Sequence, residues 1–441
     1  MLKKGVEPIY LLITWLCRII FGSVFIFSGF VKAVDPWGTY YKVNEYLEAM
    51  GMHFVPGLVL TFAFALFSLE FLIGVFILLG CYRRGAPVMG TIFMAIMLPL
   101  TLWIAIKDPV PDCGCFGDAL ILSNWATFWK NMALTAMIIW LLKFDKKTYA
   151  LVGPALQWVL FIVSIGFILM ISIRGYVRQP MFDFRPYPVG SELVSEANEE
   201  DGPHYVFVYA KDGAAKEFGE DDELPDEDDG WEFIERKEIP DNSTADKDKK
   251  LNKNFRIWDK SGSQDLTDIL LAMDNKLLLM TMPDLASVSP ATTWKINSLY
   301  DLAIENDVRM IGVVSGSSEI IKEWEDLSMP QYDIFIADDT SIKEVVRGNP
   351  GVVYVEDNEI KWKSTLDALD IEALADKKTR TNEVEVMNSG PYRANVWISM
   401  YVIITVMLIA LSLLPKLCNV YTSRRANRLH ITDDDMVHPL E

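Results

Sequence analysis

Two cysteines separated by a single glycine, Cys113 and Cys115, are the residues of this chain best suited to covalent chemistry. At this spacing their Cα atoms lie roughly 5–7 Å apart, at the outer limit for a disulfide, so the bond would close under strain. Gly114 supplies the backbone freedom that so small a ring needs. Strained, exposed disulfides exchange readily with other thiols. The spacing therefore predicts thiol–disulfide exchange, with an inert disulfide or two reduced thiols as the alternatives.

The rest of this loop carries carboxylates but too few metal ligands. Asp112 and Asp118 border it, and their charges favour the oxidised pair over a thiolate unless a neighbouring lysine, Lys32 or Lys107, offsets them. A zinc site needs four soft or imidazole ligands. The chain has four histidines, of which only two can lie on this side, so we expect no metal here. The loop is completed by Phe116 and Gly117.

The chain of 441 residues divides into an acidic part and an apolar part. Its hydrophobic fraction is 51%, although its net charge is −19. Residues 175–394 carry 24 basic and 47 acidic side chains, a net charge of −23, whereas the remainder carries 17 and 13, a net charge of +4. A soluble acidic module is therefore joined to a weakly basic membrane part. The acidic balance argues against nucleic-acid binding, which needs a basic surface.

Six apolar runs are each long enough, at about 20 residues, to cross a bilayer. Lysines and arginines flank alternate ends of these runs, which places both termini in the cytoplasm by the positive-inside rule, with Lys32, Lys42 and Lys107 as exceptions. We therefore predict a multi-pass protein of a bacterial inner membrane, with residues 175–394 and the cysteine loop on the outer side. The runs are Ile9–Val34, Leu58–Gly80, Ala86–Ile106, Asn124–Leu142, Ala155–Ile173 and Asn395–Leu414.

Ionisable residues inside the predicted spans are costly and need partners. Arg18 in the first run and Glu70 in the second both lie roughly 12–15 Å from the cytoplasmic end at 1.5 Å per residue, so we expect them to pair. Ser28 and Lys32 are further polar residues of the first run. The expected pair is either a proton or quinone-headgroup site or a structural ion pair that fixes helix register. A quinone is thus the candidate cofactor.

The segment that follows the first run is aromatic and then amphipathic. Its first residues, from Asp35 to Tyr41, include tryptophan and tyrosine, which suit the membrane interface. The pattern from Val43 to Met50 predicts a short amphipathic helix. This helix either lies on the outer membrane surface or forms a lid over the cysteine loop.

Four stretches of the membrane part carry a family resemblance: Arg18–Gly22, Phe27–Lys32, Asp35–Pro36 and Cys113–Asp118. They resemble the DoxX/MauE family of redox-associated membrane proteins, and in particular the long DoxX-like proteins of Bacteroidetes. The resemblance covers residues 1–148 and implies a four-helix membrane bundle. It also implies thiol–disulfide or quinone-linked chemistry in the cell envelope, since MauE is associated with disulfide formation in a partner enzyme. It makes Cys113 and Cys115 the candidate redox pair.

Beyond residue 254 the sequence alternates between strand and helix patterns, which fits an α/β sandwich. The predicted strands are Lys276–Met282, Val308–Val314, Asp333–Ala337, Val352–Glu356 and Glu359–Lys363, after a hairpin over 255–263. The predicted helices are Leu266–Met273, Ala291–Asn306, Glu319–Leu327 and Ser341–Val346. An acidic β-rich region precedes them, with strands at His204–Ala210 and Trp231–Ile234 and charged loops at 220–230 and 241–253.

This order resembles a thioredoxin-like or peroxiredoxin-like fold over residues 254–380, in which Pro350 is the candidate cis-proline. The active-site pair of that fold should follow the strand Lys276–Met282, but the residues there include Ser287 and no cysteine. Because no thiolate can form in the module, it cannot exchange dithiols. We expect it to serve as a binding surface.

The predicted organisation is a membrane bundle at 1–148, a fifth transmembrane helix at 149–175, an acidic region at 176–253, a thioredoxin-like domain at 254–380, a sixth transmembrane helix at 394–415 and a cytoplasmic tail at 416–441. Two functions fit it. The first is thiol–disulfide exchange with an envelope or membrane protein partner through the cysteine loop. The second is a non-catalytic membrane scaffold whose thioredoxin-like domain docks an envelope complex.

The topology can be tested with reporter fusions. We expect an alkaline phosphatase fusion after Met181 to be active and one after Lys146 to be inactive, because the enzyme matures only outside the cytoplasm and the charge pattern places these two points on opposite sides. Phosphatase activity in cells, normalised to the amount of fusion protein, measures this. The reverse pattern would contradict the predicted orientation.

Overall fold

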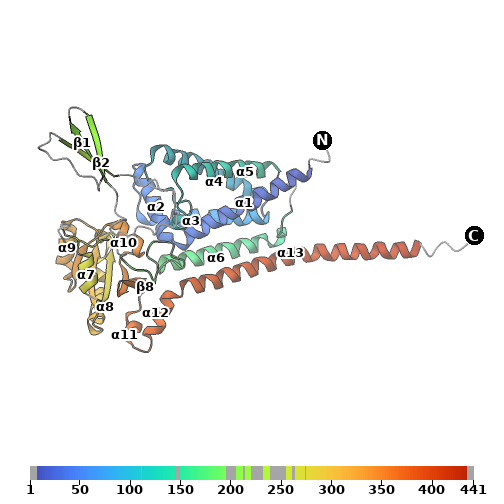
Figure 1. Ribbon diagram of the computed structural model, residues 1–441. Coiled ribbons are helices and arrows are strands. Elements are labelled where there is room, and N and C mark those ends of the chain that lie inside the picture. Colours follow the sequence, from blue (N-terminus) through green and yellow to red (C-terminus); the bar gives the residue numbers. More distant parts are fainter. Residues whose placement is uncertain are drawn as a thin grey trace, which may run out of the picture.

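Long helices running alongside one another form one part of the molecule, and a domain with a β-sheet lies at one end of them (Figure 1). They are α1 (Glu7–Val34), α3 (Pro56–Leu79), α4 (Gly85–Lys107), α5 (Asn124–Phe144), α6 (Gln157–Val177) and α13 (Gly390–Asp434). The structure, a computed structural model, describes residues 7–110, 112–144, 149–194, 205–211, 214–219, 232–238, 255–260, 264–273 and 275–434. Within these residues, five helices are long and apolar enough to cross a membrane: α1, α3, α4, α6 and the first part of α13.

The remaining predicted span, Asn124–Leu142, is α5, a helix of 21 residues that is not among the helices apolar enough to cross a membrane. It packs along α1 and α4 and is about 31 Å long at 1.5 Å per residue, the thickness of the hydrocarbon core. The chain is a multi-pass membrane protein. Figure 1 shows α1 beginning and α13 ending at the end of the bundle that is opposite to the mixed-sheet domain. That arrangement fits termini on one side, while the orientation remains a prediction.

Helices α1 and α3 contact each other backbone to backbone. A Cβ atom added at Gly29 would lie 2.6 Å from the backbone nitrogen of Phe71, and one added at Gly74 would lie 2.6 Å from that of Ile26. Transmembrane helices approach this closely only where small residues line the interface, because dispersion contacts rather than the hydrophobic effect hold them together in lipid. The glycines therefore fix the register of α1 against α3.

Helix α2 (Pro36–Ala49) lies across the end of the bundle that carries the mixed-sheet domain. Asp35 caps it by accepting a hydrogen bond of 3.0 Å from the Gly38 amide, and Pro36 occupies the first helical position, where its missing N–H costs nothing. The helix is longer than the predicted segment from Val43 to Met50. Side chains of α2 contact the cysteine loop. Of the two predicted arrangements, the helix therefore forms a lid over this loop and does not lie on the membrane surface.

The mixed-sheet domain contains five strands in the order β6-β5-β4-β7-β8. The strands β4, β5 and β6 are parallel, whereas β7 is antiparallel to β4 and β8 is antiparallel to β7. All the predicted strands and helices of this domain are confirmed within a few residues. The strands are β4 (Lys276–Met282), β5 (Arg309–Val314), β6 (Asp333–Ile336), β7 (Gly351–Glu356) and β8 (Glu359–Thr365). The helices are α7 (Thr267–Met273), α8 (Thr293–Glu305), α9 (Ser318–Ser328), α10 (Asp339–Val345), α11 (Ile371–Ala375) and α12 (Arg380–Asn388).

The central strand β4 is buried on both faces, as strands in α/β proteins are. Leu278 and Met280 pack on the side covered by α8 and α9, while Leu277 and Leu279 pack on the side covered by α7 and α10. The second core also contains Tyr187 and neighbouring residues up to position 194, whose backbone pairs with the start of β8. The domain therefore begins earlier than the predicted boundary at residue 254.

Three further predictions concern the hairpin at 255–263, the acidic β-rich region and the C-terminal tail. The hairpin at 255–263 is present as a short antiparallel bridge between Trp258 and Asp265, and residues 261–263 lie outside the described residues. Strands β1 (Tyr205–Lys211), β2 (Ala214–Gly219) and β3 (Glu232–Glu238) form a separate antiparallel sheet. The charged loops at 220–230 and 241–253 lie outside the described residues. The tail expected to begin at 416 continues α13 as far as Asp434.

The packing of α1 on α3 yields a stability prediction. Gly29→Ala should destabilise the protein by about 1–3 kcal/mol, because the new methyl group overlaps the backbone of Phe71. Gly166→Ala in α6 is the matched control, since an added methyl there meets no atom within 4 Å. Thermal unfolding of the full chain in detergent measures both. Equal melting temperatures for the two variants would show that the close approach is absent.

Candidate functional site

The two cysteines lie side by side in the loop between α4 and α5. Their sulfur atoms are 3.1 Å apart and not bonded, so the structure describes a dithiol. The exposed fractions are 6% for Cys113 and 8% for Cys115. Both thiols are buried, because α2 covers the loop from one side and α1 and α4 pack beneath it.

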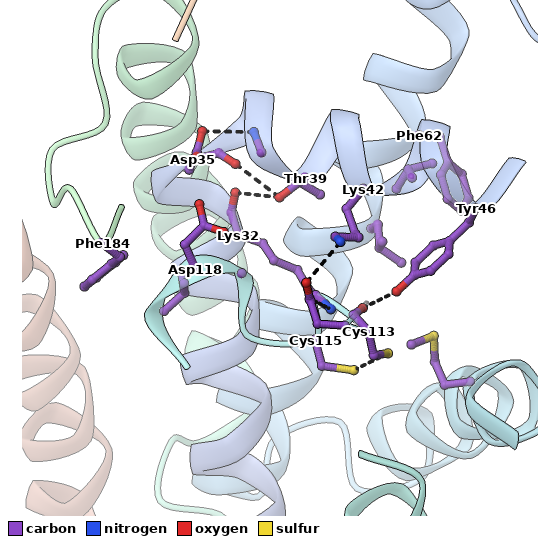
Figure 2. Close-up of a pocket in the computed structure, with 18 of the residues that line it drawn as sticks. Lys32, Asp35, Thr39, Lys42, Tyr46, Phe62, Cys113, Cys115, Asp118 and Phe184 are labelled. Atoms are coloured by element: carbon purple, nitrogen blue, oxygen red, sulfur yellow. Dashed lines mark hydrogen bonds and ion pairs between the residues drawn. The ribbon is translucent and has the colours of Figure 1, made fainter. Parts of the chain in front are cut away.

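Polar contacts hold the loop in place (Figure 2). Gly114 has φ +59°, and an added Cβ there would lie 2.7 Å from Cγ of Lys42, so only glycine fits. Asp112 accepts a hydrogen bond of 2.7 Å from the Gly114 amide and pairs with Lys42 at 3.2 Å. Tyr46, one turn further along α2, donates its hydroxyl to the Cys113 carbonyl. Two side chains of the lid therefore hold the loop that carries both thiols.

A buried ion pair lies directly beneath the loop. The Lys32 ammonium is 2.8 and 2.9 Å from the two carboxylate oxygens of Glu70, and both residues are almost fully buried. The Ser28 hydroxyl lies 3.0 Å from the same carboxylate and 2.7 Å from the Cys115 carbonyl oxygen. This chain of contacts connects α3 through α1 to the cysteine loop.

The predicted pair between Arg18 and Glu70 is therefore wrong. Arg18 donates instead to the carbonyl oxygens of Ile77, Leu78 and Tyr149 at 3.0–3.1 Å.

The cause is a difference in where the two helices start. Gly22 of α1 faces Leu78, and Gly29 faces Phe71, so α1 and α3 run antiparallel and Arg18 is level with the end of α3. Helix α1 begins well before the end of α3. Counting residues inward from the end of each helix therefore gave Arg18 and Glu70 the same depth, which is wrong.

The two thiols have unequal acidity. The hydrogen bond from Cys113 lowers the pKa of Cys115 to about 6, against the effect of burial and with the help of Lys130 and Lys32. The same hydrogen bond, together with burial, raises the pKa of Cys113. The expected suppression of thiolate by the loop carboxylates does not occur at Cys115. Asp112 is paired with Lys42, and the lysine charges act on the sulfur.

A cavity of about 380 Å³ reaches both cysteines. Its walls come from α1, α2, α3, α4, the cysteine loop and the segment after α6 (Figure 2). Its lining includes the apolar residues Phe62, Ile96 and Met50, whose exposed fractions are 54%, 65% and 40%. Since Phe62 and Ile96 are exposed on membrane-spanning helices, this part of the lining faces lipid. The cavity therefore connects the thiols to the hydrocarbon region.

The mixed-sheet domain reaches the cysteine loop through Arg347, which follows α10. Its guanidinium contacts Asp35 at 2.6 Å and Asp118 of the loop at 3.0 Å, and its side chain is 6% exposed. Burial raises the pKa of the Asp35 carboxyl, but Arg347 and Arg185 outweigh burial and hold that pKa below its usual value. The Gln179 side chain accepts a hydrogen bond from the backbone amide of Arg347 and donates one to the Arg347 carbonyl oxygen. One buried arginine thus joins the domain, the lid and the loop.

The other predicted residues are placed as follows. Phe116 is buried against Phe27, with the Lys130 ammonium 4.1 Å from its ring centroid. Gly117 has φ +52°. The peptide bond before Pro350 is cis, and the Asn349 side chain donates to the Asp284 carbonyl and the Ser287 hydroxyl at 2.7 and 2.9 Å. The sequence argument missed Tyr46, Lys130 and Arg347 as site residues. Only the position of Arg347, just before the expected cis-proline, distinguishes it in the sequence.

Comparison with known proteins finds a family over the first part of the chain. Residues 11–144 match the family model described as methylamine utilisation protein MauE. Residues 203–240 match a domain of unknown function, DUF8463. Neither a curated protein nor a solved structure matches the chain. The part of this multi-pass membrane protein that contains α1 to α5 and the cysteine pair is thus similar to MauE.

Proposed function

We propose that this protein carries out thiol–disulfide exchange through Cys113 and Cys115 at the outer face of the inner membrane. The observation that carries the proposal is the contact of 3.1 Å between two thiols of unequal acidity at the end of a lipid-facing cavity. Redox-active cysteines are found where cations or hydrogen bonds lower the pKa of one thiol. Both kinds of interaction act on Cys115.

The exchange proceeds in two steps from the disulfide form of the pair. A thiolate of the partner attacks Cys113, the bond between the two cysteine sulfurs breaks, and Cys115 leaves as a thiolate. Cys115 is the better leaving group, because the thiol with the lower pKa leaves faster. A second partner thiolate then attacks the mixed disulfide and releases Cys113. The partner loses two electrons and two protons, and the cysteine pair gains them.

Renewal of the disulfide needs an oxidant, and the cavity fits a lipid-soluble quinone. Its apolar walls, with Phe62, Ile96 and Met50 toward the lipid, suit a ring and an isoprenoid chain, while Lys42 and Tyr46 offer polar groups at the cysteine end. A quinone bound there would supply an acceptor for the two electrons and two protons of the dithiol. Lys42 and Tyr46 would also keep the loop closed over the thiols, because both already bond to it.

The mixed-sheet domain is proposed to be thioredoxin-like and to bind the partner. Three parallel strands followed by an antiparallel pair, in the order β6-β5-β4-β7-β8, support this assignment. Asn349 ties the Pro350 segment to the Asp284 and Ser287 loop, where an active-site pair would stand. Because no cysteine occurs in the domain, it presents a surface and leaves the exchange to the membrane module.

A scaffold without redox chemistry is the second candidate. The observation in its favour is the burial of both thiols beneath α2, which keeps a protein partner from the sulfurs unless the lid opens. In that case the dithiol would be a packing element, and the mixed-sheet domain would dock an envelope complex on its own.

Trapping of a mixed disulfide separates these functions. Cys115→Ser should accumulate a mixed disulfide through Cys113, and more of it than Cys113→Ser accumulates through Cys115, because Cys113 is the sulfur attacked. Acid-quenched, alkylated membranes compared with and without reductant on gels, followed by mass spectrometry, measure this. Cys81→Ser is the control and should behave as the unchanged protein. Free thiols in unreduced membranes, with no trapped species in either variant, would favour the scaffold.

The acidity of Cys115 gives a pH prediction. In the reduced protein, alkylation of Cys115 by iodoacetamide should be half-maximal near pH 6, because only the thiolate reacts and its pKa is about 6. Lys130→Gln should move this midpoint upward, since the lost ammonium no longer stabilises the thiolate.

Lys143→Gln removes a charge from the other end of α5 and serves as the control. Site-resolved mass spectrometry distinguishes the two cysteines. A midpoint for Cys115 at or above the usual value of about 8.5 would contradict the assignment of Cys115 as the acidic thiol.

A further inference from the structure

A groove of about 640 Å³ runs between α6 and α13, away from the cysteine site. It begins at the middle of α6 and ends where α6 leaves the bundle, beside the first turns of α13, and Figure 1 shows these two helices side by side. Its lining residues are Gly166, Leu169, Met170, Ile173, Arg174, Val177, Arg178, Arg393 and Trp397. One end of the groove is thus apolar, and the other carries three arginines.

The apolar end faces hydrocarbon. Met170, Ile173 and Val177 are 40%, 53% and 48% exposed, and all three belong to a candidate membrane span. A methyl group added at Gly166 would meet no atom within 4 Å, so the groove has room for another chain there. In a bilayer this surface is covered by acyl chains, since no water reaches it.

The three arginines at the other end have no carboxylate partner among the described residues. Arg393 donates from Nε to the Ser389 hydroxyl at 2.9 Å. Nε of Arg174 is buried without any hydrogen-bond partner. Three guanidinium groups at one site repel one another and need an anion to balance them. On the proposed topology they also lie on the outer side, where the positive-inside rule does not account for them.

We infer that this groove is a binding site for an anionic phospholipid. Its phosphate would accept hydrogen bonds from Arg174, Arg178 and Arg393, and guanidinium groups bind phosphate through paired, charge-assisted hydrogen bonds. One acyl chain would lie along the apolar face toward Gly166. Trp397, one turn of α13 after Arg393, also lines the groove, and tryptophan is enriched near the interfaces of membrane proteins. The site is independent of the proposed thiol chemistry.

Native mass spectrometry of the full chain, titrated with phosphatidylglycerol or phosphatidylcholine, tests this. The unchanged protein should hold one phosphatidylglycerol more tightly than phosphatidylcholine. The double variant Arg174→Gln, Arg393→Gln should bind phosphatidylglycerol about tenfold or more weakly, as expected for lost hydrogen bonds to a charged group. Lys377→Gln with Lys378→Gln removes two exposed charges from the same side of the molecule and should leave the affinity unchanged.

A second variant keeps all charges and fills the groove. Gly166→Phe should also weaken phosphatidylglycerol binding, because its ring takes the place of the acyl chain, and thermal unfolding checks that each variant is folded. Equal retention of both lipids, or binding unaffected by the arginine and glycine changes, would overturn the inference. So would displacement of the lipid by millimolar inorganic phosphate, which would identify a site for a soluble anion instead.

Discussion

The buried ion pair between Lys32 and Glu70 is the interaction on which the cysteine site depends. Both side chains are buried away from water and bond to each other, so removal of one partner would leave the other charge unpaired and would cost about 3–5 kcal/mol. Ser28 bonds to the same carboxylate and to the Cys115 carbonyl. The pair and Ser28 therefore fix the position of the cysteine loop relative to α1 and α3. These contacts form because Gly29 and Gly74 let the two helices approach closely.

The electrostatics of the site follow from this arrangement. Cys115 is the thiol that ionises more readily, first because it accepts the hydrogen bond from Cys113 and then because Lys130, beside Phe116, and Lys32 also lower its pKa. The carboxylates that border the loop are held away by cations of their own, Asp112 by Lys42 and Asp118 by Arg347. A dithiol in an apolar cavity would otherwise resist ionisation, because burial disfavours the thiolate.

The sequence predicted those features that depend on local pattern. The cysteine pair, the apolar runs and the strand and helix order of the mixed-sheet domain all follow from spacing and periodicity within a few residues. The ion pairs were not predictable in this way. Arg18 and Glu70 were paired by counting from helix ends, whereas the real partners follow from where α1 crosses α3, which the glycine contacts decide. The roles of Tyr46 and Arg347 depend on how α2 and a distant domain fold onto the loop, and no local pattern records that.

The contact of Arg347 has a consequence for how the protein is made. Arg347 is 312 residues from Asp35 and 229 residues from Asp118 in the sequence, so the bundle emerges long before the arginine that joins these two carboxylates. At a synthesis rate of about 5–20 residues per second, the delay is on the order of tens of seconds. The contact that joins the lid and the cysteine loop to the mixed-sheet domain can therefore form only after residue 347 has been translated. The cysteine site, although encoded near the beginning of the chain, is completed by a residue from one of its later parts.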